Sequence, residues 1–146
     1  MPRPTIVVDA SVAVKWILPE AGHELALQLQ EQYQNEQLDI VAPYLLISEV
    51  ANVLWKRHSR GDIGSDAAHR CLRQFLDDCP TLLDAAAVSA AALALAMAHR
   101  RPVYDCLYLA LALEQRCDLI TADERFFNAM TTAFPCIRLL RSCTFE

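Results

Sequence analysis

Four carboxylates stand at positions where a buried element has no packing use for a charge. Asp9 closes the β-branched run "TIVV", and Asp123 follows the run "LIT". Glu49 has leucine and valine neighbours on its own face of a predicted helix, and Asp105 opens a segment that continues "CLYLALAL". If these side chains converge, they repel one another strongly, at about 4 kcal/mol for a pair about 4 Å apart. A hard divalent cation with oxygen ligands would resolve that repulsion.

The chemistry implied by such a site is metal-assisted hydrolysis of phosphodiester bonds. Mg²⁺ or Mn²⁺ binds a few carboxylates, keeps several waters and leaves coordination positions open for phosphate oxygens. The cation lowers the pKa of a bound water and offsets the charge that develops on the phosphate. No serine, cysteine or histidine nucleophile is required.

Two of the carboxylates also have a simple structural explanation as helix caps. Asp9 could cap the short helix that follows it, and Ser11 could do the same. Asp123 could cap the next helix, or "TADE" could form a capping box from Thr121 to Glu124.

The other two carboxylates have structural alternatives of a different kind. Glu49 could form an ion pair with Lys56 or Arg57, although these lie a turn or more away along the predicted helix. Asp105 could interact with a helix dipole, an effect of about 0.3 to 1 kcal/mol. Convergence of all four at one place is therefore the observation that separates a functional site from four local roles.

Short β-type runs alternate with helical segments along the whole chain, and no repeat or linker interrupts them. This alternation predicts a single domain over residues 1–146 with the α/β class of fold, a three-layer α/β/α sandwich around a mostly parallel sheet. Ligands of such sheets bind at the carboxyl ends of the strands, where Asp9 and Asp123 lie. Strands are predicted at 5–9, 38–42, 81–84, 118–122 and 136–140; helices at 10–16, 21–34, 43–58, 65–78, 85–101, 104–116 and 123–130.

Composition sets the broad class of the protein. With 146 residues, of which 54% are hydrophobic, the chain can bury a sizeable core. The apolar run at the N-terminus is cut by Asp9 and Lys15, so it is not a signal peptide, and we expect a cytosolic protein. The uncharged stretch from Ala85 to Ala98 is too short and too rich in alanine to span a bilayer, and it is predicted to be a buried helix. The net charge of −5 argues against a generally basic nucleic-acid binder.

The cysteines and histidines do not predict a metal site or a disulfide framework. None of the six cysteines forms a CxxC pair, so we expect reduced and mostly buried thiols. The four histidines are scattered without the spacing of a zinc site.

Four segments together resemble the acidic motifs of PIN-domain ribonucleases, most closely the VapC toxins of prokaryotic toxin–antitoxin modules. In order they are "VVDASVAVKWILPE", "APYLLISEVANVLWK", "VYDCLYLALALE" and "LITADERF". By this resemblance Asp9, Glu49, Asp105 and Asp123 match the family's metal-binding acids; we call these four residues the acidic quartet. Ser11 and Thr121 match its hydroxyl positions, and Asn52 matches its polar neighbour to the glutamate.

The resemblance also implies an activity and partners. The implied activity is that of an Mg²⁺- or Mn²⁺-dependent endoribonuclease that cuts structured RNA such as tRNA or ribosomal RNA loops. The implied partners are a second copy of the chain, in a homodimer, and a VapB-type antitoxin. A PIN fold that acts mainly by binding an antitoxin or RNA, without significant cleavage, remains the alternative. Two other classes of protein are disfavoured by missing residues. Phosphatases of the haloacid dehalogenase type need a second aspartate where this chain has Ser11, and receiver domains need a lysine after a late strand, whereas the only lysines here are Lys15 and Lys56. Trp55 is a plausible contact for a partner, but its helical spacing favours a place in the core.

Overall fold

Five short strands form one parallel sheet at the centre of the molecule. The structure is a computed structural model that describes residues 2–145. The strand order is β3-β2-β1-β4-β5, so β1 lies in the middle and the order reverses between β1 and β4. All neighbours pair in parallel. The strands are β1 (Thr5–Val8), β2 (Asp39–Pro43), β3 (Thr81–Leu83), β4 (Asp118–Thr121) and β5 (Ile137–Leu139).

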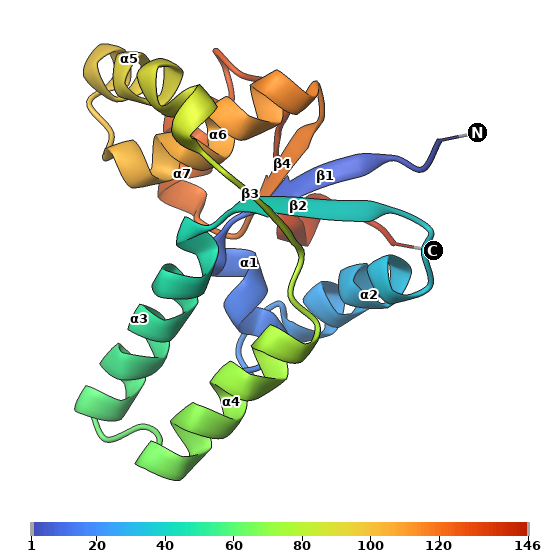
Figure 1. The fold of residues 1–146 in the computed structure, drawn as a ribbon, viewed down its shortest axis with the longest axis vertical. Coiled ribbons are helices and arrows are strands. Elements are labelled where there is room, and N and C mark those ends of the chain that lie inside the picture. The colour runs from blue at the N-terminus through green and yellow to red at the C-terminus, as the bar shows by residue number, and fades with distance from the viewer. Residues whose placement is uncertain (1, 146) are drawn as a thin grey trace.

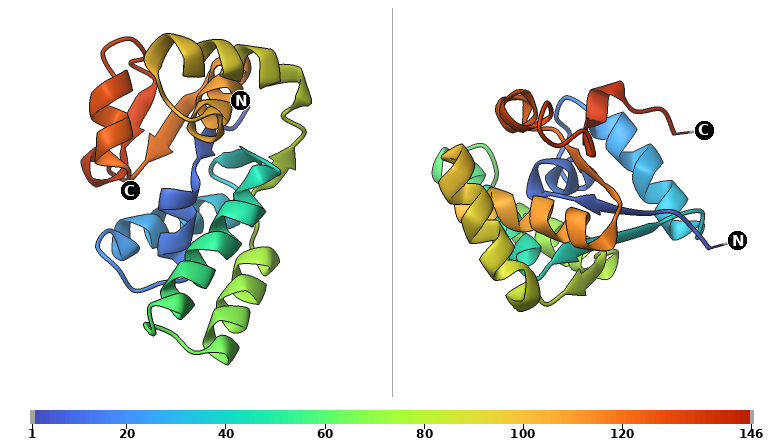
Figure 2. Two further views of the ribbon diagram at one scale, coloured as in Figure 1. Left: turned by 90° about the vertical axis from the view of Figure 1, so that its left-hand side faces the viewer. Right: turned by 90° about the horizontal axis from the view of Figure 1, so that it is seen from above.

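Helices cover both faces of the sheet, which confirms the predicted α/β/α sandwich. On one face α6 lies against β1, β2 and β4, and α5 packs on α6. The other face is covered by α1, α2 and α7, as seen from above in Figure 2. A hairpin of α3 and α4 extends away from the sheet (Figure 1). The α-helices are α1 (Ala10–Ala13), α2 (His23–Gln34), α3 (Leu45–Ser59), α4 (Ser65–Asp77), α5 (Ser89–His99), α6 (Val103–Gln115) and α7 (Glu124–Met130); 3₁₀ turns are η1 (Val14–Trp16), η2 (Ala86–Val88) and η3 (Leu140–Ser142).

Trp16 joins the helices on the second face of the sheet. Its side chain is 2% exposed, and its indole Nε1 donates a hydrogen bond to the carbonyl oxygen of Ala26 at 2.9 Å. The ring stacks against Phe75 of α4, with centroids 6.4 Å apart. A buried indole N–H needs such an acceptor, so Trp16 fixes η1, α2 and α4 relative to one another.

The two apolar helices on the first face differ from each other in burial. In α6, Cys106 and the run from Tyr108 to Ala112 are buried, as its sequence predicts. In α5 only Ala92 is buried, whereas Leu93 is 50% and Met97 69% exposed. The prediction of a buried helix over 85–98 is therefore wrong, because α6 occupies the place against the sheet and α5 lies outside it.

Two further findings concern the whole described chain. Within residues 2–145, no helix combines the length and the apolar character needed to cross a membrane. The six cysteines are all free, as expected, but only Cys106 and Cys143 are buried, so the prediction that most of the thiols are buried is wrong.

Candidate active site

Asp9 lies where β1 ends and α1 begins, and three donors hold its carboxylate. Oδ1 accepts hydrogen bonds from the Ser11 hydroxyl at 2.5 Å and from the Val12 amide at 3.4 Å. Oδ2 accepts one from the Thr121 hydroxyl at 2.5 Å. Burial raises the pKa of Asp9 to about 6, and these hydrogen bonds, which favour the charged form, oppose the rise. Asp9 is thus the N-cap of α1 and also a carboxyl group whose charged form is disfavoured by burial.

Two hydroxyl groups tie the end of β1 to the end of β4. The Ser11 and Thr121 oxygens lie 3.3 Å apart. The Ala122 amide donates to Ser11 Oγ at 2.8 Å, and the Asp123 amide donates to Thr121 Oγ1 at 3.1 Å. Thr121 is fully buried. This network fixes the side chain of Asp9 relative to Asp123, which gives Ser11 and Thr121 a positioning role.

Asp123 caps α7 directly. Its Oδ1 accepts a hydrogen bond from the Phe126 amide at 3.1 Å. The alternative capping box from Thr121 to Glu124 is wrong, because Thr121 belongs to β4 and Glu124 pairs with Arg141 at 2.7 Å. Capping leaves Asp123 Oδ2 without a hydrogen bond to any described residue.

Glu49 reaches the same edge of the sheet from the first half of α3. Its Oε1 accepts a hydrogen bond from the hydroxyl of Tyr108 on α6 at 2.5 Å. Burial raises the pKa of Glu49, Tyr108 lowers it and the charge of Asp105 raises it. The ion pair with Arg57 considered above is absent among the described residues, since Arg57 pairs with Glu20 instead.

Tyr108 is a member of this site that the sequence analysis did not single out. It lies one helical turn after Asp105 and is 2% exposed, and burial and the neighbouring carboxylates raise the pKa of its hydroxyl far above its ordinary value. A buried tyrosine hydroxyl needs a partner, so a tyrosine between two leucines and one turn after Asp105 was a signal that could have found it.

Asp105 lies in the first turn of α6, as predicted. Burial raises its pKa, the charge of Asp123 raises it further, and Arg101 lowers it. The guanidinium of Arg101 stands 5.7 Å from the centroid of the Phe126 ring. Its Nε is buried and has no hydrogen-bond partner among the described residues. Arg101 thus places a positive charge beside the quartet without forming an ion pair within it.

The electrostatic effects among the acidic quartet link all four side chains. Asp123 raises the pKa of Asp9 and of Asp105, and Asp105 raises that of Glu49. Within the described part of the chain none of the four forms an ion pair, and Asn52, one turn after Glu49, makes no side-chain hydrogen bond. Asp9 and Asp123 follow neighbouring parallel strands, and the bond from Tyr108 to Glu49 joins α3 to the helix that carries Asp105, so the four acids lie in one region at the carboxyl edge of the sheet, beside the point where strand order reverses.

The donor chemistry of this site fits a hard cation. Its side chains offer oxygen atoms only, and none of them forms an ion pair with a described basic residue, although Arg101 stands near Asp105. Among residues 2–145, no three Asp, Glu, His or Cys side chains stand close enough together to hold one ion. Mg²⁺ commonly takes only one or two carboxylates from a protein and completes its shell with waters, so it does not require three close carboxylates.

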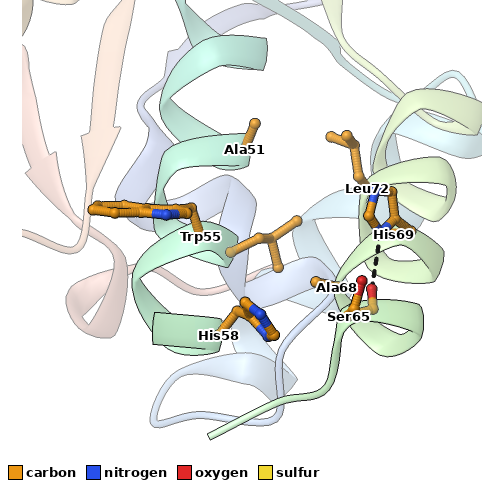
Figure 3. Close-up of a pocket in the computed structure, with 8 residues that line it drawn as sticks. Ala51, Trp55, His58, Ser65, Ala68, His69 and Leu72 are labelled. Atoms are coloured by element: carbon orange, nitrogen blue, oxygen red, sulfur yellow. Dashed lines mark hydrogen bonds between the residues drawn. The ribbon is translucent and has the colours of Figure 1, made fainter. Parts of the chain in front are cut away.

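A separate cavity lies between α3 and α4, away from the quartet (Figure 3). Its volume is about 210 Å³, and Trp55 on its rim is 61% exposed. The preference for a core position of Trp55 is therefore wrong, because α4 packs on a neighbouring face of α3 and leaves the indole outside. The lining consists of Ala51, Leu54, Trp55, His58, Ser65, Ala68, His69 and Leu72.

Comparison of the sequence with models of known protein families identifies the family to which this fold and its four acids belong. The model of the family described as "PIN domain" matches residues 6–130. The chain therefore belongs to the PIN-domain family.

Within that family, the chain is similar in sequence to a curated ribonuclease. Ribonuclease VapC3 from Pyrobaculum aerophilum is 35% identical over 132 residues, which cover 87% of this chain and 98% of that protein. Among solved structures, PAE2754 from Pyrobaculum aerophilum superimposes with a TM-score of 0.70 at 23% identity, over 97% of this chain and 94% of its own. A toxin–antitoxin complex from Klebsiella pneumoniae gives a TM-score of 0.64 at 18% identity, over 92% of this chain and 97% of the matched chain. These two structures show the shared fold.

Proposed function

We propose that residues 1–146 form a single nuclease domain, a metal-dependent endoribonuclease that acts as the toxin of a toxin–antitoxin pair. The observation that carries the proposal is the acidic quartet at the carboxyl edge of a PIN fold, where its members form no ion pair with any described residue. The name of the relative, Ribonuclease VapC3, supports RNA as the substrate. The proposed location of this activity is the cytoplasm, and tRNA or ribosomal RNA is the proposed substrate class.

In this proposal the quartet, Asp9, Glu49, Asp105 and Asp123, would hold Mg²⁺ or Mn²⁺. Such a cation, when bound, supplies an activated water and neutralises charge on the phosphate. Ser11 and Thr121 orient Asp9, because their hydroxyls occupy one lone pair on each of its oxygens. Tyr108 orients Glu49 in the same manner.

Arg101 has a distinct part in the proposed reaction. Its guanidinium stands close enough to Asp105 to lower the pKa of that carboxyl. A guanidinium in this position favours an incoming phosphodiester, because it attracts phosphate oxygens with directed N–H groups.

Two protein partners are proposed for this chain. A fold shared with the toxin–antitoxin complex from Klebsiella pneumoniae supports a VapB-type antitoxin as a partner of this chain. A homodimer is proposed as well, and the exposed Leu93 and Met97 on α5 are apolar surface that a second copy would bury.

Substitution of Asp9 by asparagine tests the proposed activity with the largest expected effect. The parent should cut purified RNA with Mn²⁺ or Mg²⁺ and stop in EDTA, and Asp9→Asn should abolish cutting because it removes a charge that the cation requires. Asp118→Asn, at the other edge of the sheet, serves as the control and should cut like the parent. The assay is gel analysis of labelled RNA.

Undiminished cutting by Asp9→Asn would disprove the role of the quartet. A parent protein that binds RNA or its antitoxin tightly but never cuts, with either metal, would support the alternative of a PIN fold that acts by binding.

A further inference from the structure

A cavity of about 310 Å³ opens directly beside the acidic quartet, between α3 and the first turn of α6. Glu49 is one of its walls. Ala10, the residue after Asp9, and Tyr104, the residue before Asp105, line it too. Three of the four acids thus contribute themselves or a direct neighbour, so a group in this cavity lies next to whatever the quartet binds.

The wall formed by α3 combines the apolar side chains of Leu45 and Val53 with a stripe of polar ones. Ser48, Asn52 and Lys56 follow one another at intervals of four residues, so they form one stripe along the helix. All three are exposed. Within the described chain, none of their side chains makes a hydrogen bond or an ion pair. A hydroxyl, an amide and an ammonium group are therefore free to bind a ligand.

The lining also includes an aromatic ring from α6. Tyr104 stands in the first turn of this helix and is 61% exposed. An exposed ring and a row of free hydrogen-bonding groups on the lining of one cavity fit a flat, polar-edged ligand. Nucleobases have this combination of an aromatic face and a hydrogen-bonding edge.

We propose that this cavity binds one unpaired nucleobase of single-stranded RNA, next to the phosphodiester bond at the acidic quartet. The base stacks on Tyr104, the side chains of Ser48 and Asn52 bond its edge, and Lys56 neutralises a neighbouring phosphate. This inference rests on the proposed nuclease function and adds a base-binding cavity beside its acidic residues.

Two probes separate stacking of a base from attraction to the backbone. One is a short fluorescein-labelled single-stranded RNA of random sequence, and the other is an abasic RNA of the same length. Binding is measured by fluorescence anisotropy in the Asp9→Asn protein, so that both probes stay intact.

Tyr104→Ala should weaken binding of the random RNA about tenfold, because loss of one base–aromatic stack typically costs that much or more. The same variant should bind the abasic RNA like its parent, and Tyr104→Trp should bind the random RNA at least as well as the parent. Asn52→Ala should lose less affinity and should change the preference among homopolymers of the four bases.

Trp55→Ala is the matched control, since this aromatic residue on α3 is also 61% exposed but lines the other cavity. It should leave both probes bound as before. Equal losses on both probes, or equal losses in Trp55→Ala and Tyr104→Ala, would overturn the proposal. Loss of binding to a VapB-type antitoxin in Tyr104→Ala, with RNA binding unchanged, would identify the cavity as a protein contact and would overturn it too.

The binding assay also separates this inference from the proposed function. If the parent never cuts RNA while Tyr104→Ala still loses base-dependent binding, the nuclease function fails and the nucleobase cavity stands. If the parent cuts RNA and Tyr104→Ala binds the random RNA like its parent, the cavity proposal alone fails.

Discussion

The two edges of the central sheet treat the same chemical group in opposite ways. At the amino edge, Asp39 opens β2 and pairs with Arg3 at 3.1 Å, and Asp118 opens β4 and pairs with Arg138 at 3.5 Å. Both carboxylates are more than 40% exposed. At the carboxyl edge, the acidic quartet has no ion pair among the described residues, and burial raises the pKa of three of its members.

The acids at the two edges therefore differ in their effect on the stability of the fold. An exposed ion pair contributes about 0 to 1 kcal/mol to stability, so the amino edge is close to neutral. A buried carboxylate whose pKa is raised favours the unfolded chain at neutral pH, where it must be ionised in both states. The carboxyl edge thus lowers the stability of the free protein, and a cation that binds there would restore it.

The largest expected effect on stability comes from Asp9→Asn in EDTA. Because the pKa of Asp9 rises from 3.8 unfolded to about 6 folded, the parent should be most stable below pH 3.8 with respect to this group. That contribution, about 3 kcal/mol, should be lost as the pH rises through about 6. At pH 8 the asparagine variant should therefore be more stable than the parent. Chemical denaturation across this pH range measures the difference.

The control for this measurement is Asp118→Asn, which should change the free energy of unfolding by about 1 kcal/mol or less at every pH. If Asp9→Asn proves much less stable than the parent at pH 8, the carboxylate serves chiefly as the cap of α1, and the contrast between the edges is lost.

Mn²⁺ should have a slightly smaller effect on stability, and it should act at one edge alone. A ligand that binds only the folded state stabilises it by about 2.7 kcal/mol at a hundred times its dissociation constant. The melting temperature of the parent and of Asp118→Asn should therefore rise with Mn²⁺ concentration, while that of Asp9→Asn rises much less. Circular dichroism melts give the result, and equal shifts in all three proteins would locate the ion elsewhere.

Tyr108→Phe should produce the smallest of these effects. Loss of the 2.5 Å hydrogen bond leaves Glu49 free to rotate, so the affinity for Mn²⁺ should fall about tenfold, or 1.4 kcal/mol. Isothermal titration calorimetry measures this affinity. Tyr44→Phe, which alters an exposed ring, is the control. Unchanged affinity in Tyr108→Phe would mean that the hydroxyl only satisfies its own burial.

Much of the framework follows from local patterns in the sequence. The run before Asp9 and the run before Asp123 predict two strands, and their parallel pairing brings the two carboxylates to one edge. Glu49 was separable from a surface acid because its helical neighbours are apolar. These arguments depend on nearest neighbours along the chain, which is the information that a single sequence carries most directly.

What could not be predicted depends on contacts between distant elements. The hydrogen bond from Tyr108 to Glu49 joins α6 to α3 across 59 residues. Met97 is exposed because α6, and not α5, lies against the sheet, and Trp55 is exposed because α4 packs on a different face of α3. Hydrophobic periodicity gives the face of a helix but not its rank in the packing.

The burial of the two tryptophans provides a spectroscopic tool. The chain has only two tryptophans. Trp16 is sealed in the core with its N–H bonded, whereas Trp55 lies on the outside of α3. Excitation at the indole band should therefore give a blue-shifted emission that quenchers do not reach and a red-shifted emission that they do. One unlabelled sample can thus report unfolding and surface occupancy separately, and Trp55→Phe would isolate the first signal.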